Sequence, residues 1–123
     1  MGKLETGRAG ENAAARHLRR HGYRIIERNL RLGRLGEIDI VAEKRGVLAI
    51  VEVKSVIAGT DISGFEHITA AKQRKLTELA QAYIQQERPK FKAVRFDAVE
   101  VVFADASLRR YSITHLEDAF RAG

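Results

Sequence analysis

The chain of 123 residues contains no cysteine, no tryptophan and a single proline, Pro89. Without cysteine the protein can form no disulfide bond, thiolate nucleophile or cysteine-ligated zinc or iron–sulfur centre. A cysteine-free chain suits a reducing compartment, and we expect a cytoplasmic protein. The longest apolar run near the middle of the chain, Val47 to Val51, is far shorter than the roughly 20 residues of a membrane-spanning helix. We therefore expect no membrane partner.

The chain does contain enough apolar sequence for a core, and it has an excess of basic residues. Its hydrophobic content is 45%, which suits one domain over residues 1–123 without metal or disulfide staples. Its 22 lysines and arginines outnumber 16 acidic residues, giving a net charge of +6. A small basic domain is predisposed to bind polyanions such as nucleic acid, although modest positive charge also serves solubility alone.

Periodicity and turn residues predict an α/β fold with the order α-β-β-β-α-β-β. The predicted helices span residues 7–21, 69–88 and, as a short last element, 116–121; the predicted strands span 23–32, 37–42, 47–55, 94–104 and 109–113. Thr6 is the expected N-cap of the first helix, and residues 56–67 are expected to form a mobile loop. The long helix between the third and fourth strands predicts a crossover, and hence a mixed central sheet flanked by helices.

Acidic residues inside apolar strands are the main functional signal. The second predicted strand contains the run GEIDIV (36–41), and the third contains AIVEVK (49–54). Because side chains alternate along a strand, Asp39 faces away from the isoleucines on either side of it, which are expected to point into the core. Glu52 and Lys54 share one face of the next strand for the same reason.

Buried carboxylates are costly unless they are paired or bound to a metal. If Asp39 and Glu52 lie side by side they repel each other, and a divalent cation removes the conflict. Oxygen ligands without cysteine favour Mg²⁺ or Mn²⁺ as the cofactor. Lys54 would reach the same site, where an ammonium group can orient a water or offset charge on a phosphate. The alternative is an ordinary cross-strand salt bridge at the surface.

Asp39 followed by Glu52-Val53-Lys54 resembles the D…E-x-K signature of the PD-(D/E)XK nuclease superfamily. More closely, the chain resembles the bacterial YraN family of predicted endonucleases, which are akin to Holliday-junction resolvases. The matching residues extend over most of the chain: Gly7, Gly10, Glu11, Ala14, Leu18, Gly22, Tyr23, Asn29, Arg31, 36–39, 51–54, Lys72, Gln73 and 95–97. Two positions depart from the pattern. Ile38 replaces the superfamily's proline, and Val56 stands where the family often has an arginine.

The resemblance implies a restriction-endonuclease-like fold with an αβββαβ core. It implies metal-dependent hydrolysis of phosphodiester bonds in nucleic acid, with DNA, including branched DNA, as the expected substrate. Asp39 and Glu52 match the metal-binding carboxylates, and Lys54 matches the catalytic lysine. The alternatives are a non-catalytic nucleic-acid-binding module of the same fold and a structural protein that docks a partner by its sheet edge.

Three further residues are assigned by the same resemblance. Glu11 matches the acid on the first helix that completes the metal site in resolvase-like members, although an acid in the first turns of a helix is also common for electrostatic reasons. Gln73 matches a polar helix residue that borders the site, or is simply solvated. Glu37 is expected to be an auxiliary metal ligand or to support the residues that bind the metal. Because resolvase-like relatives act as dimers on two-fold symmetric junctions, a homodimer is expected.

Basic residues are concentrated in two segments. Residues 16–34 contain seven arginines and one acid, and residues 72–95 contain seven lysines and arginines and two acids. Two basic segments beside an acidic site suit a phosphate backbone, although they are also typical of solvated polar faces. With only 7% aromatic residues, stacking on bases is not indicated.

The histidines and the acid of the fourth strand are expected to be structural. His17 and His21 lie one helical turn apart, but no further ligand accompanies them, so we expect no zinc site there. His115 is interpreted as a loop or surface residue. Asp97 is expected to pair with Arg95 or with a neighbouring strand.

Overall fold

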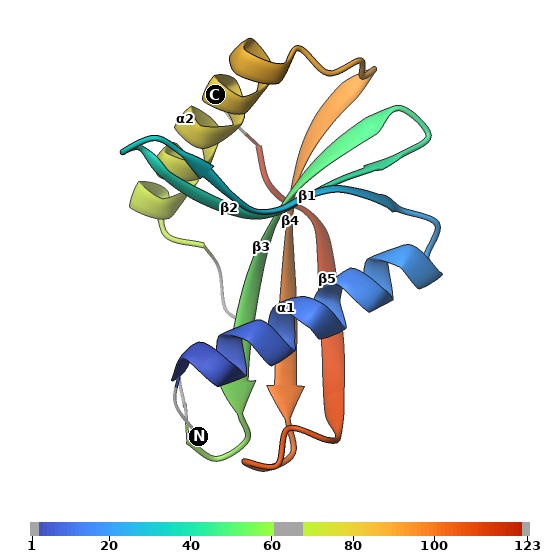
Figure 1. Cartoon of the computed structure of the whole chain (residues 1–123), viewed down its shortest axis with the longest axis vertical. Helices are drawn as coiled ribbons and strands as arrows, with labels where there is room; N and C mark the ends of the chain where they lie inside the picture. The colour runs from blue at the N-terminus through green and yellow to red at the C-terminus, as the bar shows by residue number, and fades with distance from the viewer. Residues whose placement is uncertain (1–2, 61–67, 122–123) are drawn as a thin grey trace.

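The computed structural model describes residues 3–60 and 68–121 of the chain (Figure 1). The elements in these ranges are two helices, α1 (Lys3–Arg20) and α2 (Ala70–Glu87), and five strands, β1 (Arg24–Leu32), β2 (Gly36–Lys44), β3 (Val47–Ile57), β4 (Ala93–Phe103) and β5 (Tyr111–Phe120). Their order along the chain is the predicted one. Neither of these helices is long and apolar enough to cross a membrane.

The five strands form one mixed sheet whose order in space follows the chain, β1-β2-β3-β4-β5. β3 and β4 are parallel because the crossover through α2 separates them, and the other neighbours are antiparallel. Figure 1 shows α1 crossing β3 and β4 on one side of the sheet, and α2 lying beside the β1–β2 hairpin on the other. The protein is therefore a mixed α/β fold, consistent with a restriction-endonuclease-like core.

The sheet separates two hydrophobic cores. The core under α1 includes Ala13, Ala14, Leu18, Ile40, Val51, Val99 and Phe103. The core under α2 includes Leu76, Leu79, Tyr83, Ile38, Val41, Ile50 and Phe96. A strand buried on both faces needs apolar side chains at nearly every position. This requirement explains the long aliphatic runs of β3 and β4, and it makes each acid within them conspicuous.

β2 separates from β3 at Asp39. The β2–β3 ladder ends at the pair Ile40–Val51, and from there toward the hairpin turn β2 pairs only with β1. Asn29, which stands across from Asp39 in the hairpin, has a φ of 50°, a left-handed conformation that asparagine tolerates better than most residues. Ile40 belongs to the core under α1 and Ile38 to the core under α2. The expectation that the two isoleucines share a face is therefore wrong. The regular alternation of side chains along β2 is interrupted where this strand separates from β3.

Two other local predictions are wrong. α1 begins at Lys3, so Thr6 lies inside the helix and does not cap it. Residues 116–121 form no helix, because β5 continues to Phe120. The ring of Phe120 stacks on Phe96 of β4 with the ring centroids 4.6 Å apart. This packing against the sheet outweighs the local helical tendency of the segment.

The boundaries around α2 are close to the predicted ones. The Thr69 hydroxyl accepts a hydrogen bond from the Lys72 backbone N–H at 3.2 Å and caps the helix, and Pro89 follows its end. β3 runs on to Ile57, so the first two residues of the predicted loop 56–67 belong to a strand. Residues 61–67 of that loop lie outside the described part of the chain.

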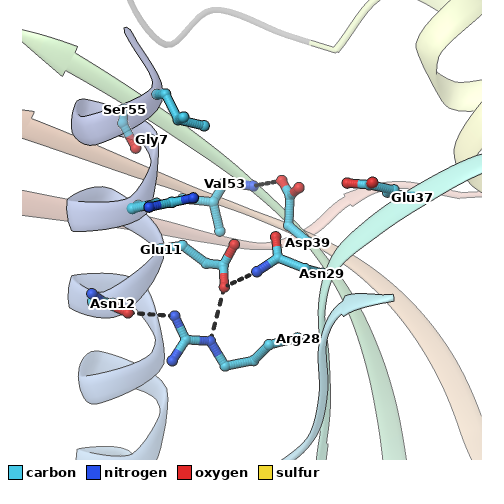
Figure 2. Close-up of a pocket in the computed structure, with 11 residues that line it drawn as sticks. Gly7, Glu11, Asn12, Arg28, Asn29, Glu37, Asp39, Val53 and Ser55 are labelled. Carbon is cyan, nitrogen blue, oxygen red and sulfur yellow. Dashed lines mark hydrogen bonds and ion pairs between the residues drawn. The ribbon is translucent and has the colours of Figure 1, made fainter. Parts of the chain in front are cut away.

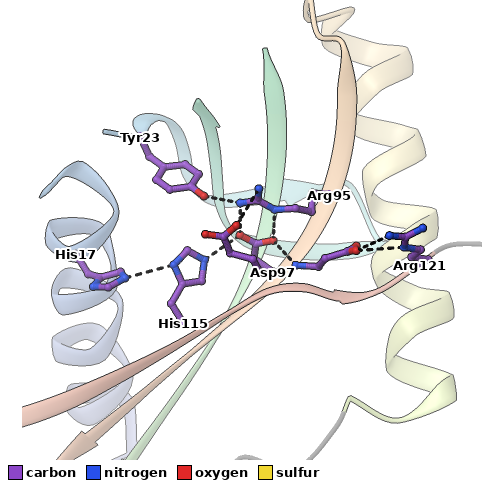
Figure 3. A network of polar contacts seen from close by, with 8 residues as sticks. His17, Tyr23, Arg95, Asp97, His115 and Arg121 are labelled. Carbon is purple, nitrogen blue, oxygen red and sulfur yellow. Dashed lines mark hydrogen bonds and ion pairs between the residues drawn. The ribbon is translucent and has the colours of Figure 1, made fainter. Parts of the chain in front are cut away.

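Asp97 of β4 is the centre of a buried polar network (Figure 3). Its carboxylate is fully buried and accepts hydrogen bonds from Arg95 Nε at 2.7 Å, His115 Nε2 at 2.9 Å and the Asp118 backbone N–H at 3.1 Å. Burial opposes ionisation of Asp97, but the hydrogen bonds from His115, Arg95 and Asp118 outweigh it and lower the pKa of the carboxyl.

The same network joins three elements of the fold. His115 of β5 also contacts His17 of α1, with 3.3 Å between the two ring nitrogens. The predicted pairing of Asp97 with Arg95 is confirmed. The interpretation of His115 as a surface residue is wrong, since only 10% of its side chain is exposed. A local sequence pattern does not show that β5 carries this side chain over Asp97.

We expect Asp97→Asn to lower the free energy of unfolding at pH 7 by about 2–4 kcal/mol, because an amide cannot replace the charged acceptor of three donors. The loss should persist down to about pH 4, the ordinary pKa of an unfolded aspartate. It should shrink as the pH falls through the lowered pKa of folded Asp97, because the wild type then loses the same charge.

Urea denaturation of both proteins between pH 7 and pH 3 measures this dependence. Glu78→Gln, at an exposed position of α2, is the control for the loss of one charge and should change stability little. A difference between Asp97→Asn and wild type that does not vary with pH would show that the charge does not hold the network together.

Candidate active site

Asp39 and Glu52 meet at the point where β2 separates from β3. Asp39 Oδ2 accepts a hydrogen bond of 2.8 Å from the Val53 N–H (Figure 2). This N–H lies just beyond the last β2–β3 pair, so the Asp39 side chain takes the place of a backbone carbonyl of β2. Asp39 and Glu52 lie directly beyond the last β2–β3 pair, Ile40–Val51, and are close enough for Glu52 to act on the pKa of Asp39.

Two carboxyl groups in this position are in electrostatic conflict. Burial, and then the charge of Glu52 and the hydrogen bond to it, raise the pKa of Asp39 to about 7, while the Val53 N–H works in the opposite direction. The pair therefore retains a proton near neutral pH when no cation is bound. A divalent cation held by both carboxylates would replace that proton, so the donor set fits Mg²⁺ or Mn²⁺.

Lys72 of α2 brings a positive charge to the pair. Its Nζ lies 2.7 Å from Glu52 Oε2, and the hydrogen bond to Glu52 raises the pKa of Lys72 despite partial burial. The sequence places Lys72 in a basic segment and among the residues that match the YraN family, but it predicts no contact with Glu52. The signal that could have singled it out is its position directly before Gln73, which had been assigned to the border of the site.

Lys54 lies on the same face of β3 as Glu52, as the alternation of side chains requires. It is half-buried and stands in register with Glu100 of the parallel strand β4. The face that holds Glu52 therefore carries an ammonium group from β3 in addition to the one that α2 contributes.

Glu11 faces Asp39 from α1, but β1 supplies its partners. Its Oε1 accepts hydrogen bonds from Arg28 Nε at 2.8 Å and Asn29 Nδ2 at 3.0 Å (Figure 2). Arg28 also donates to the side chain of Asn12. The charge of Glu11 also raises the pKa of Asp39, after the larger effects of burial and of Glu52.

Two other predicted site residues lie around the pair. Glu37 accepts a hydrogen bond of 3.0 Å from exposed Arg31. Gln73 Nε2 donates to the carbonyl oxygen of Ile68 at 2.8 Å and so fixes the segment before α2. Across residues 3–60 and 68–121, no three Asp, Glu, His or Cys side chains form a group that could hold a metal. The carboxyl groups that the structure brings together are those of Asp39 and Glu52, whereas Glu11 and Glu37 bind arginines.

A pocket of about 690 Å³ lies on the α1 side of Asp39 (Figure 2). Its walls are the first half of α1, the kinked part of the hairpin and the end of β3. The hydrogen-bond donors in the lining come from Arg8, Asn12, Arg28, Asn29 and Ser55. Guanidinium, amide and hydroxyl donors beside a carboxyl pair suit a phosphate group.

Gly10 allows α1 to approach the end of β3. A Cβ atom on Gly10 would lie 1.7 Å from Ser55 Oγ and 2.6 Å from Ser55 Cβ, so no other residue fits without a shift of the helix or the strand. Gly10 directly precedes Glu11. The close approach therefore sets how far Glu11 stands from the hairpin.

Sequence comparison finds similar proteins in several bacteria. The sequence model of the family described as "Uncharacterised protein family UPF0102" matches residues 10–101. A UPF0102 protein of Persephonella marina is 42% identical over 116 residues, covering 93% of this chain and 91% of that protein. One of Symbiobacterium thermophilum is 48% identical over 95 residues (77% and 80%), and one of Clostridium perfringens is 35% identical over 113 residues (91% and 90%).

We expect Gly10→Ala to destabilise the protein by about 1–3 kcal/mol, because the added methyl group overpacks the contact between α1 and β3. Gly7→Ala is the matched control on the same helix. Nothing lies within 4 Å of its added Cβ, so it should stabilise the helix by up to about 1 kcal/mol.

Adding Ser55→Gly to Gly10→Ala removes both atoms that clash with the new methyl group. Chemical denaturation of the single and double variants should therefore give a favourable coupling energy of about 1 kcal/mol or more. Equal effects of Gly10→Ala and Gly7→Ala would show that the close approach does not constrain α1.

Proposed function

Because the chain belongs to the uncharacterised protein family UPF0102, also called the YraN family, we propose a function from its site: a metal-dependent endonuclease that hydrolyses phosphodiester bonds in DNA. The observation that carries the proposal is the meeting of Asp39 and Glu52 where two strands separate, with the Lys72 ammonium 2.7 Å from Glu52. Paired acids of neighbouring strands with a lysine beside them are a suitable arrangement for phosphodiester chemistry.

Asp39 and Glu52 would hold the divalent cation, Mg²⁺ or Mn²⁺. The bound cation would polarise the phosphoryl oxygen and lower the pKa of a coordinated water. The hydrogen bond from the Val53 N–H fixes the position of the Asp39 carboxyl group beside β3. Lys54 would orient the attacking water, and Lys72 would offset the negative charge that builds up on the phosphate oxygens as the bond to water forms.

The proposed substrate follows from the charges around the site. Arg8 and Arg28 line the pocket, and the exposed Arg31 and Arg34 lie on the β1–β2 hairpin next to it. Guanidinium groups beside a site are well suited to contact the phosphate backbone. The resemblance to resolvase-like nucleases favours DNA, including branched DNA, and a homodimer that would match a two-fold symmetric junction.

One observation favours a second candidate function. The Lys72–Glu52 ion pair balances part of the carboxyl charge without a metal. The same fold would then serve as a non-catalytic nucleic-acid-binding module in which a lysine neutralises the acidic pair. The two candidates differ in whether the protein binds a divalent cation at Asp39 and Glu52.

We expect Asp39→Asn and Glu52→Gln each to reduce Mn²⁺-dependent cleavage of flap or four-way-junction DNA on the order of 100-fold or more, because each removes a charged ligand. Both variants should also lose Mn²⁺ binding measured by calorimetry without DNA, while retaining affinity for DNA. Glu78→Gln controls for net charge and should behave as wild type. DNA binding by a wild-type protein that neither binds millimolar Mn²⁺ nor cleaves would favour the binding module.

We expect Lys72→Gln to increase Mn²⁺ affinity roughly 5-fold, because an ammonium group near Glu52 repels a bound cation. The same variant should cleave more slowly at saturating metal. Arg74→Gln, at an exposed position of the same helix, removes a charge without this contact and serves as the control. Mn²⁺ titrations that give equal affinities for the two variants would show that Lys72 does not influence the cation.

A further inference from the structure

The group formed by Glu11, Arg28 and Asn29 is not explained by the proposed metal site. Glu11 is only 8% exposed, and one of its oxygens, Oε1, receives both donors from β1. A carboxylate that already accepts from a guanidinium and an amide has its charge balanced without a metal. The contacts of Glu11 therefore indicate that it binds side chains of β1.

Arg28 is held from one side, which fixes the direction of its guanidinium group. Its Nε donates to Glu11 and its Nη2 donates to Asn12, the next residue of α1. A guanidinium carries five N–H groups in a rigid planar arrangement, and these two contacts use only two of them. About a third of the Arg28 side chain is exposed, and Arg28 lines the pocket beside Asp39.

Asn29 is the second residue of β1 that binds Glu11, and its backbone conformation is unusual for a strand. Its φ of 50° lies in the left-handed region, which asparagine tolerates better than most residues with a side chain, and Asn29 stands across from Asp39 in the hairpin. The hydrogen bond of 3.0 Å from its amide to Glu11 helps to hold this conformation. Arg28, the neighbour of Asn29 in β1, and Asp39 both line the same pocket.

We propose that Glu11 is a positioning residue that holds Arg28 and Asn29 against α1, so that Arg28 binds a backbone phosphate of DNA beside the carboxyl pair. This inference rests on the proposed function for the identity of the substrate. It departs from the role that the resemblance assigns to Glu11, because the carboxylate acts through Arg28 and not on the metal.

Removing Glu11 should change DNA affinity in the direction opposite to that expected for an ordinary surface acid. Removing an acid from a surface that binds a polyanion ordinarily strengthens binding, because one repulsion is lost. If Glu11 positions Arg28, Glu11→Ala should instead weaken DNA binding, roughly 5- to 10-fold. Glu5→Gln, at an exposed position of the same helix, should leave DNA affinity unchanged or increase it slightly.

Fluorescence anisotropy with a labelled junction in EDTA, at several salt concentrations, measures this binding without any catalysis. Arg28→Gln should weaken binding to a similar extent and lower the slope of log affinity against log salt by about 1, the signature of one lost phosphate contact. Because both variants disable the same contact, the double variant Glu11→Ala/Arg28→Gln should bind no worse than Arg28→Gln alone.

Mn²⁺ calorimetry separates this inference from the function it rests on. Glu11→Ala should lower Mn²⁺ affinity by no more than about 5-fold through the lost negative charge, whereas Asp39→Asn should abolish binding. A larger loss of Mn²⁺ affinity in Glu11→Ala, or additive losses of DNA affinity in the double variant, would overturn the positioning role while leaving the nuclease proposal intact. If wild type binds no Mn²⁺, the nuclease proposal fails and the salt slopes still test Arg28.

If Glu11→Ala does not fold, Glu11→Gln can replace it in the comparison of DNA affinity with wild type. The amide keeps an acceptor for Asn29 and removes the charge partner of Arg28. Circular dichroism establishes folding before each titration. Weaker DNA binding by Glu11→Gln supports the proposal, and unchanged or tighter binding contradicts it.

Discussion

The candidate site depends on one unpaired backbone group, the N–H of Val53. Where β2 turns away from β3, this donor loses the partner that a continued ladder would supply, and the Asp39 carboxyl group accepts its hydrogen bond instead. The same contact holds Asp39 against Glu52 of the strand it has left. The separation of two strands thus creates both the space for a pocket and the pair of acids beside it.

Two aspartates of the sheet show how environment decides the behaviour of one side-chain type. Asp97 is more buried than Asp39, yet its pKa is lowered because a guanidinium, an imidazole and a backbone N–H all donate to it. The pKa of Asp39 is raised to about 7 because burial is joined by a second carboxyl group. The first arrangement stabilises the fold, whereas the second places two like charges together, and a bound cation would relieve their repulsion.

The two helices approach this pair from opposite sides of the sheet. α1 comes close at Gly10 and presents Glu11 to Arg28 and Asn29 of the hairpin, which form one wall of the pocket. α2 delivers Lys72 to Glu52. The acids are therefore flanked by cations that belong to different structural layers, and their relative positions depend on the packing of both cores.

The sequence by itself determined the order of elements, the mixed sheet and the strands that carry Asp39 and Glu52, because periodicity and turn residues are local properties. It did not reveal that residues 116–121 form a strand, since stacking of Phe120 on Phe96 is a contact between distant segments. Only the tertiary structure decided that Lys72 forms an ion pair with Glu52 and that Arg28 forms one with Glu11. The partners in these ion pairs depend on where the helices pack and on the backbone conformation at Asn29. The spacing of residues in the sequence does not determine either of them.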